Sequence, residues 1–200
     1  MVAQKIRCPT GALILPPEVK LSTTKLPESD EVMKKLVIDL DGTLIDSAPD
    51  IHASVNKMLL AEGQAALDLA TATSFIGNGL PKLVERVMAH VGMDMGAFDR
   101  VVADVLAIYN AHGAELTRVY PHVSEVLKVL KENGFRLGVC TNKPHEPAVI
   151  ILDDLGLAGL FDVVIGGDST AAKKPDPTPL KAAMAALGGG VLYVGDSEID

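Results

Sequence analysis

The sequence predicts an α/β protein: a doubly wound parallel sheet with a small α-helical unit inserted after the first strand. From Tyr120 onward, strand-like and helix-like segments alternate, which is typical of parallel sheets covered by helices on both faces. Upstream, residues 36–38 form a continuous apolar run, as expected of a strand buried inside such a sheet. Residues 48–117, between these two parts, have mostly helical spacing, and this is longer than a simple crossover needs.

The first strand ends in two aspartates, within the segment KKLVIDLDGTLIDS (residues 34–47). Residues two apart on an extended backbone point the same way, so we expect Asp39 and Asp41 to face one spot beyond the strand's carboxyl end. Two adjacent carboxylates repel unless a proton or cation lies between them, and their oxygens suit a hard ion such as Mg²⁺. Taken alone, D-x-D-G is equally compatible with a solvated turn. An EF-hand loop is excluded because Leu44 stands where that loop requires glycine.

Composition is that of an ordinary globular protein. The 200 residues are 48% hydrophobic and 22% charged, with a net charge of −8. This allows one domain, or a core domain with an insertion, and argues against a nucleic-acid or anionic-membrane partner. No apolar run approaches the ~20 residues of a membrane span. There is no recognisable signal sequence, and two cysteines make no disulfide framework, so we expect a cytoplasmic protein.

Residues 1–32 differ from the rest of the chain. Prolines interrupt them and two stretches are polar, so we expect a flexible leader with little packed structure. Met33 begins a segment that looks like a natural protein start. We therefore expect the leader to be dispensable for folding.

The insertion, residues 48–117, is expected to be a helical cap. Apolar spacing predicts helices over residues 49–62, 67–76, 81–91 and 95–112. Such a unit can cover the carboxyl ends of the strands, where the two aspartates lie.

The core is expected to comprise residues 33–47 and 118–200. Its later part predicts helices over 123–133, 146–155 and 178–187, and strands over 136–140, 163–165 and 191–194. The chain ends at Asp200, immediately after the fourth core strand. An unpaired apolar edge would remain there. We therefore expect the 200-residue form to be poorly stable or weakly active, and a C-terminally extended form to work.

Polar residues follow three of the four predicted core strands. Asp39 and Asp41 follow the first, Thr141 follows the second and Asp196 follows the fourth. Lys174 precedes Pro175 on a segment that should be extended. Three acids, a hydroxyl and an ammonium at one edge of a sheet suit phosphoryl transfer, which depends on positioning and charge neutralisation.

In this order, DLDGT (39–43), Thr141, Lys174-Pro175 and GDSEID (195–200) resemble the four motifs of the haloacid dehalogenase superfamily. The resemblance covers residues 33–200 and implies a Rossmann-like core with a small helical cap. More narrowly, IGNGLPKLVERVM (76–88), VCTNKPHEPA (139–148) and KKPDPTPL (173–180) resemble bacterial phosphoglycolate phosphatases. That family implies a small phosphorylated metabolite, 2-phosphoglycolate, as the substrate.

The resemblance also implies roles for individual residues. Asp39 would be the nucleophile that forms an aspartyl-phosphate, and Asp41 the general acid and then the general base. Thr141, helped by the backbone of Asn142, would hydrogen-bond the phosphoryl group. Lys174 would neutralise charge on the nucleophile and on the phosphoryl oxygens.

Mg²⁺ is the implied cofactor. Its ligands would be Asp39, Asp196 and the main-chain carbonyl of Asp41, with Asp200 supporting the metal site or Lys174. In the cap, Gly79 and Lys82 stand at the start of the helix that Pro81 opens, and its N-terminus could meet the carboxylate of the substrate.

Several alternatives remain open at this stage. Other sugar-phosphate or nucleotide phosphatases and phosphomutases share the four motifs, whereas the presence of Asp41 argues against the dehalogenase branch, which needs neither an acid there nor a metal. A non-enzymatic module on the same fold is a further alternative, for which the abrupt end at Asp200 is the argument. The oligomeric state is left open.

Overall fold

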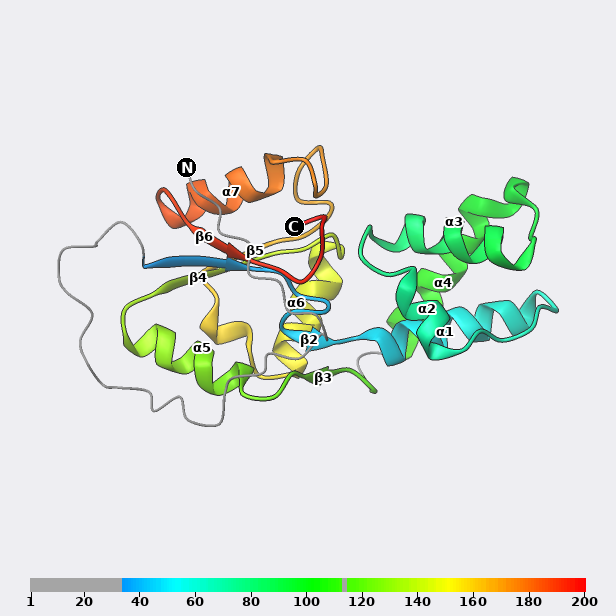
Figure 1. Ribbon diagram of the computed structural model, residues 1–200, viewed down its shortest axis with the longest axis horizontal. Coiled ribbons are helices and arrows are strands. Elements are labelled where there is room, and N and C mark those ends of the chain that lie inside the picture. The colour runs from blue at the N-terminus through cyan, green and yellow to red at the C-terminus, as the bar shows by residue number, and fades with distance from the viewer. Residues whose placement is uncertain (1–33, 113–114) are drawn as a thin grey trace.

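A computed structural model of the protein describes residues 34–112 and 115–200. These residues form an α/β core and, beside it, a group of helices (Figure 1). The predicted leader, residues 1–32, lies outside the described residues.

The core contains a four-stranded sheet in the order β5-β4-β1-β6, in which all neighbouring strands are parallel. The first strand in sequence is thus an inner strand: Val37 pairs with Gly138 on one side and with Tyr193 on the other. This position explains its continuous apolar run, because both faces of an inner parallel strand are buried. The strands are β1 (Lys35–Ile38), β4 (Arg136–Cys140), β5 (Val163–Ile165) and β6 (Leu192–Val194).

Helices cover both faces of the sheet, as the sequence predicts. Helices α5 (Val123–Glu132) and α6 (His145–Asp154) lie on one face, and α7 (Thr178–Leu187) lies on the other (Figure 1). Successive residues of β1 serve the two faces: Ile38 packs in the cluster that includes α5 and α6, whereas Val37 packs in the cluster that includes α7. The doubly wound α/β prediction is confirmed.

Residues of the insertion form helices α1 (Ala48–Ala61), α2 (Leu69–Ser74), α3 (Leu80–Val91) and α4 (Phe98–His112), with a 3₁₀ turn at Met95–Ala97. They enclose a hydrophobic cluster of their own, built largely from α1, α3 and α4. Helix α2 is shorter than the predicted 67–76 at both ends, and it begins two residues late because Asp68 caps it, accepting a hydrogen bond from the backbone N–H of Thr71. None of the described helices is long and apolar enough to cross a bilayer.

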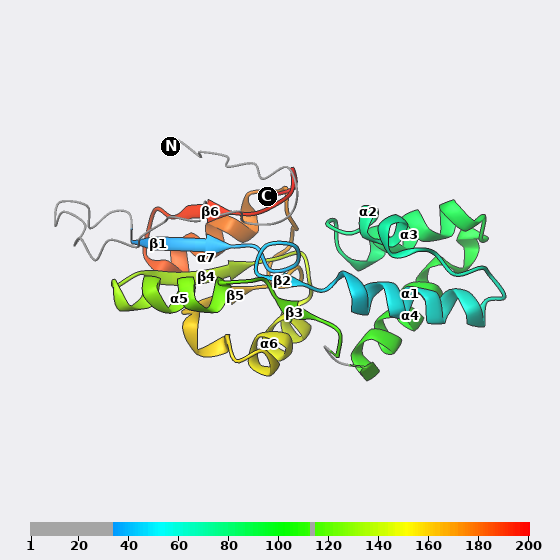
Figure 2. The same ribbon diagram turned by 60° about the horizontal axis from the view of Figure 1, so that its bottom comes forward.

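The chain passes between core and helices twice, and the two passages are paired. Strand β2 (Ile45–Asp46) and strand β3 (Arg118–Val119) form a short antiparallel ladder (Figure 2). The buried carboxylate of Asp50 adds a second link by accepting hydrogen bonds from the N–H groups of Leu116 and Thr117. Sequence reasoning missed this ladder. We propose that the cap is delimited here, with residues 48–117 on one side.

Candidate active site

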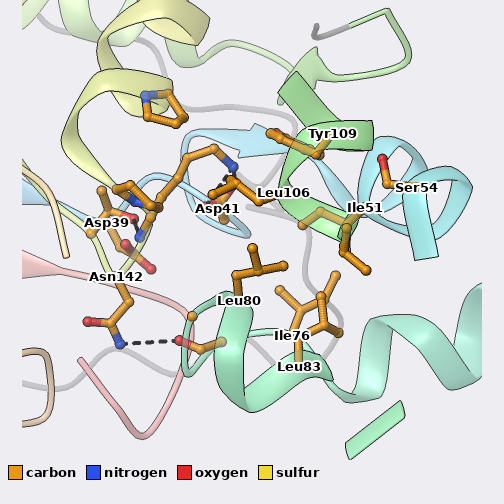
Figure 3. Close-up of a pocket in the computed structure, with 17 residues that line it drawn as sticks. Asp39, Asp41, Ile51, Ser54, Ile76, Leu80, Leu83, Leu106, Tyr109 and Asn142 are labelled. Atoms are coloured by element: carbon orange, nitrogen blue, oxygen red, sulfur yellow. Dashed lines mark hydrogen bonds and ion pairs between the residues drawn. The ribbon is translucent and has the colours of Figure 1, made fainter. Parts of the chain in front are cut away.

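The carboxyl ends of β1 and β4 face the helical cap across a cavity of about 90 Å³ (Figure 3). The backbone ladder continues one residue past each strand: the N–H of Asp39 donates to Val194, and that of Thr141 donates to Ile165. This fixes Asp39 and Thr141 at the edge of the sheet. The core residues that line the cavity are Asp39, Asp41, Thr141, Asn142, Lys143, Pro144 and Pro147.

Asp39 is buried at the base of this cavity, with 8% of its surface exposed. The Nζ atom of Lys174 lies 2.8 Å from Oδ1 of Asp39, although no described group donates a well-directed hydrogen bond to that oxygen. Burial raises the pKa of Asp39 to about 7, while the Lys174 ammonium acts to lower it. The carboxylate is therefore poorly solvated and open to a further cationic partner.

Lys174 is held by a second acid. Its Nζ donates to Oδ1 of Asp200 at 2.5 Å, and the same oxygen accepts a hydrogen bond from the hydroxyl of Tyr193 at 2.9 Å. Burial alone would lower the pKa of Lys174, but Asp39 and Asp200 together raise it. The pKa of Asp200 responds in the opposite direction. Burial alone would raise it, but the Lys174 ammonium outweighs burial, so that the pKa of Asp200 is lowered. At neutral pH this gives an ammonium fixed between two carboxyl groups.

Asp196 completes a group of acids. Carboxylate oxygens of Asp39, Asp196 and Asp200 lie within 4.8 Å of one another. Oδ1 of Asp196 accepts a hydrogen bond from Oγ1 of Thr43 at 2.8 Å. Gly42 lets the backbone of the loop after β1 approach the Asp196 carboxylate closely, since a Cβ atom at residue 42 would lie 2.5 Å from Oδ2 of Asp196. Such a set of hard oxygen donors, one of them buried without a directed hydrogen bond, could hold a cation.

Asp41 has different partners from Asp39. Nζ of Lys143 lies 3.0 Å from Oδ1 and 3.3 Å from Oδ2 of Asp41, and Oγ of Ser47 donates to Oδ1 at 2.5 Å. Burial alone would lower the pKa of Lys143, but the Asp41 carboxylate and the Tyr109 hydroxyl together reverse this and raise it. Asp41 therefore faces the cavity as one half of an ion pair.

The loop after β4 connects these groups. The hydroxyl of Thr141 accepts a hydrogen bond from the backbone N–H of Lys143 at 3.1 Å. The carboxamide of Asn142 is bonded to the backbone of Lys174, so the loop also anchors the lysine segment. Gly167 permits this packing, because a Cβ atom there would lie 2.3 Å from the carbonyl oxygen of Asn142.

The two cap residues predicted to bind substrate lie in different surroundings. Gly79 lines the cavity and faces the Asn142 backbone, where a Cβ atom would lie 3.4 Å from the carbonyl oxygen. Lys82 is absent from the cavity lining and pairs with Glu85 one turn along the exposed side of α3, at 2.8 Å. A role of either residue in substrate binding stays a prediction.

A family model described as haloacid dehalogenase-like hydrolase matches residues 36–200 of this chain. The chain belongs to this family. This match confirms the family membership that the four motifs predict.

This haloacid dehalogenase-like hydrolase has close curated relatives. It is 50% identical over 171 residues to the phosphoglycolate phosphatase of Cereibacter sphaeroides, covering 84% of this chain and 78% of that protein. It is 42% identical over 168 residues to the phosphoglycolate phosphatase of Rhodobacter capsulatus, covering 82% and 76%. A solved structure, described as a predicted phosphoglycolate phosphatase from Haemophilus somnus 129PT, aligns with a TM-score of 0.79 and 31% identity over 84% of this chain and 79% of that chain.

Sequence reasoning missed three side chains of the hydrolase site. Lys143 directly follows the predicted Thr141-Asn142 pair, and Tyr109 occurs in a cap helix where apolar spacing alone was informative. Tyr193 lies inside β6 and looks like an ordinary strand residue. For Lys143 a signal existed, namely its place one residue beyond a strand-end motif. Tyr109 and Tyr193 became visible only through tertiary packing.

Proposed function

We propose that this hydrolase is a Mg²⁺-dependent phosphatase that converts 2-phosphoglycolate and water to glycolate and inorganic phosphate. The observation that carries the proposal is the buried Asp39 carboxylate at the cavity base, 2.8 Å from the Lys174 ammonium. The curated relatives named phosphoglycolate phosphatase support the choice of substrate. The small volume of the cavity, about 90 Å³, also favours a small phosphomonoester.

In the first step, a carboxylate oxygen of Asp39 attacks the phosphorus atom of the ester. A bond forms between that oxygen and phosphorus, and the bond from phosphorus to the ester oxygen breaks. The departing alkoxide takes a proton from Asp41, which lines the same cavity and has to enter this step in its protonated form. Lys174 offsets the negative charge that gathers around Asp39, and the hydroxyl of Thr141 offers a hydrogen bond to the phosphoryl group.

In the second step, Asp41 accepts a proton from water as the water oxygen attacks the phosphorus of the aspartyl-phosphate. The bond between phosphorus and the Asp39 oxygen breaks, which releases inorganic phosphate and restores the carboxylate. Asp41 thus returns to its starting protonation state for the next cycle only after both proton transfers.

Asp39, Asp196 and the main-chain carbonyl of Asp41 would hold Mg²⁺, and Asp200 would support Lys174 through the contact described above. When bound, the ion supplies positive charge that reduces repulsion between the substrate phosphate and the carboxylates. Each of these groups offers hard oxygen, as Mg²⁺ prefers.

The test is phosphate release from 2-phosphoglycolate, measured with and without Mg²⁺, together with a panel of sugar phosphates and nucleotides. Asp39→Asn is the control, because an amide cannot act as the nucleophile yet nearly preserves the shape of the side chain. We expect Mg²⁺-dependent release that the control abolishes and a preference for 2-phosphoglycolate. An isomerised sugar phosphate instead of free phosphate would indicate a mutase, and equal rates across the panel would contradict the substrate assignment.

A further inference from the structure

Lys143 is the only cation among the described residues that line the cavity. Its side chain is 8% exposed. Its ammonium contacts both oxygens of Asp41, at 3.0 Å and 3.3 Å. The backbone of Lys143 is fixed in turn, because its N–H donates to Oγ1 of Thr141. The lysine is therefore held by the loop after β4, and its ammonium meets the carboxylate of Asp41, the acid that follows β1.

The two oxygens of Asp41 are held unequally. Oδ1 accepts hydrogen bonds from both Ser47, at 2.5 Å, and Lys143, at 3.0 Å. Oδ2 has only the longer contact of 3.3 Å to Lys143 among the contacts seen in the described part of the chain. Oδ2 is thus the atom that is better able to exchange a proton with the ester oxygen or with water.

On its other side, the Lys143 ammonium contacts a residue of the cap. Tyr109 projects from α4 and lines the cavity, and its ring centroid lies 4.8 Å from Nζ of Lys143. A cation this close to an aromatic face is attracted by the negative potential of the ring. The buried Tyr109 hydroxyl makes no well-directed hydrogen bond to a described residue, although it is near enough to Lys143 to raise the pKa of that lysine. The contact of the Tyr109 ring with Lys143 is therefore the one that bears on the position of the ammonium.

We propose that Lys143 is a positioning residue for Asp41, and that Tyr109 of the cap holds Lys143 in the position that this requires. The inference rests on the proposed phosphatase function, and it assigns proton transfer to Oδ2 of Asp41. It also gives the cap a part in proton transfer, because the Tyr109 ring can hold Lys143 in place only while α4 is next to the loop after β4. General acid–base catalysis depends on holding the acid within hydrogen-bond reach of the reacting oxygen.

A different role for Lys143 makes a different prediction. A cavity cation could instead bind the carboxylate of 2-phosphoglycolate, and its loss would then affect only substrates that carry a carboxylate. A positioning role affects every substrate whose leaving group needs a proton. It has little effect on p-nitrophenyl phosphate, because the p-nitrophenolate ion departs without protonation.

The first experiment measures kcat/KM of Lys143→Met with three substrates: 2-phosphoglycolate, 2-hydroxyethyl phosphate and p-nitrophenyl phosphate. The second substrate has an alkoxide leaving group but no carboxylate. The ratio kcat/KM includes steps only up to departure of the leaving group, so it isolates the proton donation. Lys128→Met, an exposed substitution on α5, is the matched control.

We expect kcat/KM to fall about 100-fold with both alkyl esters and less than about 5-fold with the aryl ester, within the range that a general acid supplies. The loss should appear in kcat rather than in KM, and Lys143→Arg should recover part of it. Equal losses with all three substrates would overturn the proposal in favour of a structural or phosphate-binding role. A loss confined to 2-phosphoglycolate would overturn it in favour of a carboxylate ligand.

The second experiment separates the ring of Tyr109 from its hydroxyl. Tyr109→Phe keeps the aromatic face, whereas Tyr109→Leu removes it and keeps an apolar side chain. We expect the alkyl-to-aryl ratio of kcat/KM to fall about 10-fold in the Leu variant and less than about 2-fold in the Phe variant. Urea unfolding of both variants checks their folding. An unchanged ratio in the Leu variant, or equal falls in both, would remove Tyr109 from the proposal.

These outcomes are distinct from failure of the proposed function. A wild-type enzyme that prefers another alkyl phosphomonoester refutes the substrate assignment, and 2-hydroxyethyl phosphate still tests Lys143. A wild-type protein that hydrolyses none of the three substrates overturns both proposals.

Discussion

The carboxamide of Asn142 is hydrogen-bonded to the backbone of Lys174 in both directions. Nδ2 of Asn142 donates to the Lys174 carbonyl oxygen at 3.1 Å, and Oδ1 accepts from the Lys174 N–H at 2.9 Å. One side chain thus pairs with the main chain as a neighbouring strand would. These two hydrogen bonds link the loop after β4 to the segment that carries Lys174, although the two are far apart in sequence.

We predict that Asn142→Ala lowers the free energy of unfolding by about 3 kcal/mol, because it leaves buried main-chain groups of Lys174 without partners. It should also lower kcat, since Lys174 loses its anchor. Urea denaturation and steady-state kinetics measure the two effects. Asn133→Ala is the control: its Nδ2 also donates to a backbone carbonyl, but at an exposed position, so we expect a change within about 0.5 kcal/mol. Equal stability losses in the two variants would contradict the anchoring role.

Gly42→Ala should damage the acidic group specifically. A Cβ atom at residue 42 would lie 2.5 Å from Oδ2 of Asp196, and Gly42 has a φ of 89°. We expect weaker Mg²⁺ activation, by about 10-fold or more in the concentration required, as well as a stability loss of about 1–2 kcal/mol. Gly63→Ala is the matched control, because Gly63 also has a positive φ, of 69°, but a Cβ atom there would have no neighbour within 4 Å. It should show the stability loss while Mg²⁺ activation stays normal.

The buried Asp39 makes stability depend on pH in the metal-free protein. Its pKa is about 7 in the folded protein, against an ordinary value of 3.8. Between these values the folded state binds a proton that the unfolded chain lacks, so this group makes the free energy of unfolding fall as pH rises. At ~1.4 kcal/mol per pKa unit the total approaches about 4 kcal/mol.

Asp39→Asn removes this titration. In the presence of EDTA, we expect the stability of the Asn variant relative to the wild type to improve by about 3 kcal/mol between about pH 4.5 and about pH 8, most of that total. Urea unfolding at each pH measures the difference. Mg²⁺ at pH 8 should stabilise the wild type more than the variant. A stability difference that stays constant with pH would show that Asp39 is not buried as described.

Asp50→Asn should weaken the paired passages between core and cap. The Asp50 carboxylate accepts hydrogen bonds from the N–H of Leu116 and from both the N–H and the hydroxyl of Thr117. An amide cannot accept all of these, and hydrogen bonds to a charged group contribute about 1.5–3 kcal/mol each. We expect a loss of about 2–4 kcal/mol in urea unfolding. Asp99→Asn, on the exposed first turn of α4, should leave stability unchanged within about 0.5 kcal/mol.

Much of the core followed from local signals. The strands at 136–140 and 163–165 have the predicted bounds, because apolar runs between glycine and polar boundaries identify buried parallel strands well. The meeting of Asp39 and Thr141 at one edge follows from parallel pairing of β1 with β4. Strand-end residues are therefore predictable wherever the sheet is parallel.

Other parts depend on contacts that no local pattern carries. Strands β2 and β3 have two residues each, too few to show a period. Lys82 stands in the first turn of α3, where Glu85, three residues on, gives it a partner on the exposed side, and its predicted part in substrate binding stays a prediction. Tyr109 meets Lys143 only in the tertiary structure, where Nζ lies 4.8 Å from the ring centroid, although the two residues are on different parts of the chain.

The β2–β3 ladder makes the cap separable in a genetic sense. Because the chain leaves and re-enters the core through adjacent strands at Asp46 and Arg118, the interval between them can be exchanged without rerouting any strand of the main sheet. A donor helical segment spliced at these two residues would keep the aspartates and lysines of the core and bring a new wall to face them. Swapping this one interval is thus a direct way to retarget the enzyme, provided that the donor segment places an aromatic ring against Lys143 as Tyr109 does.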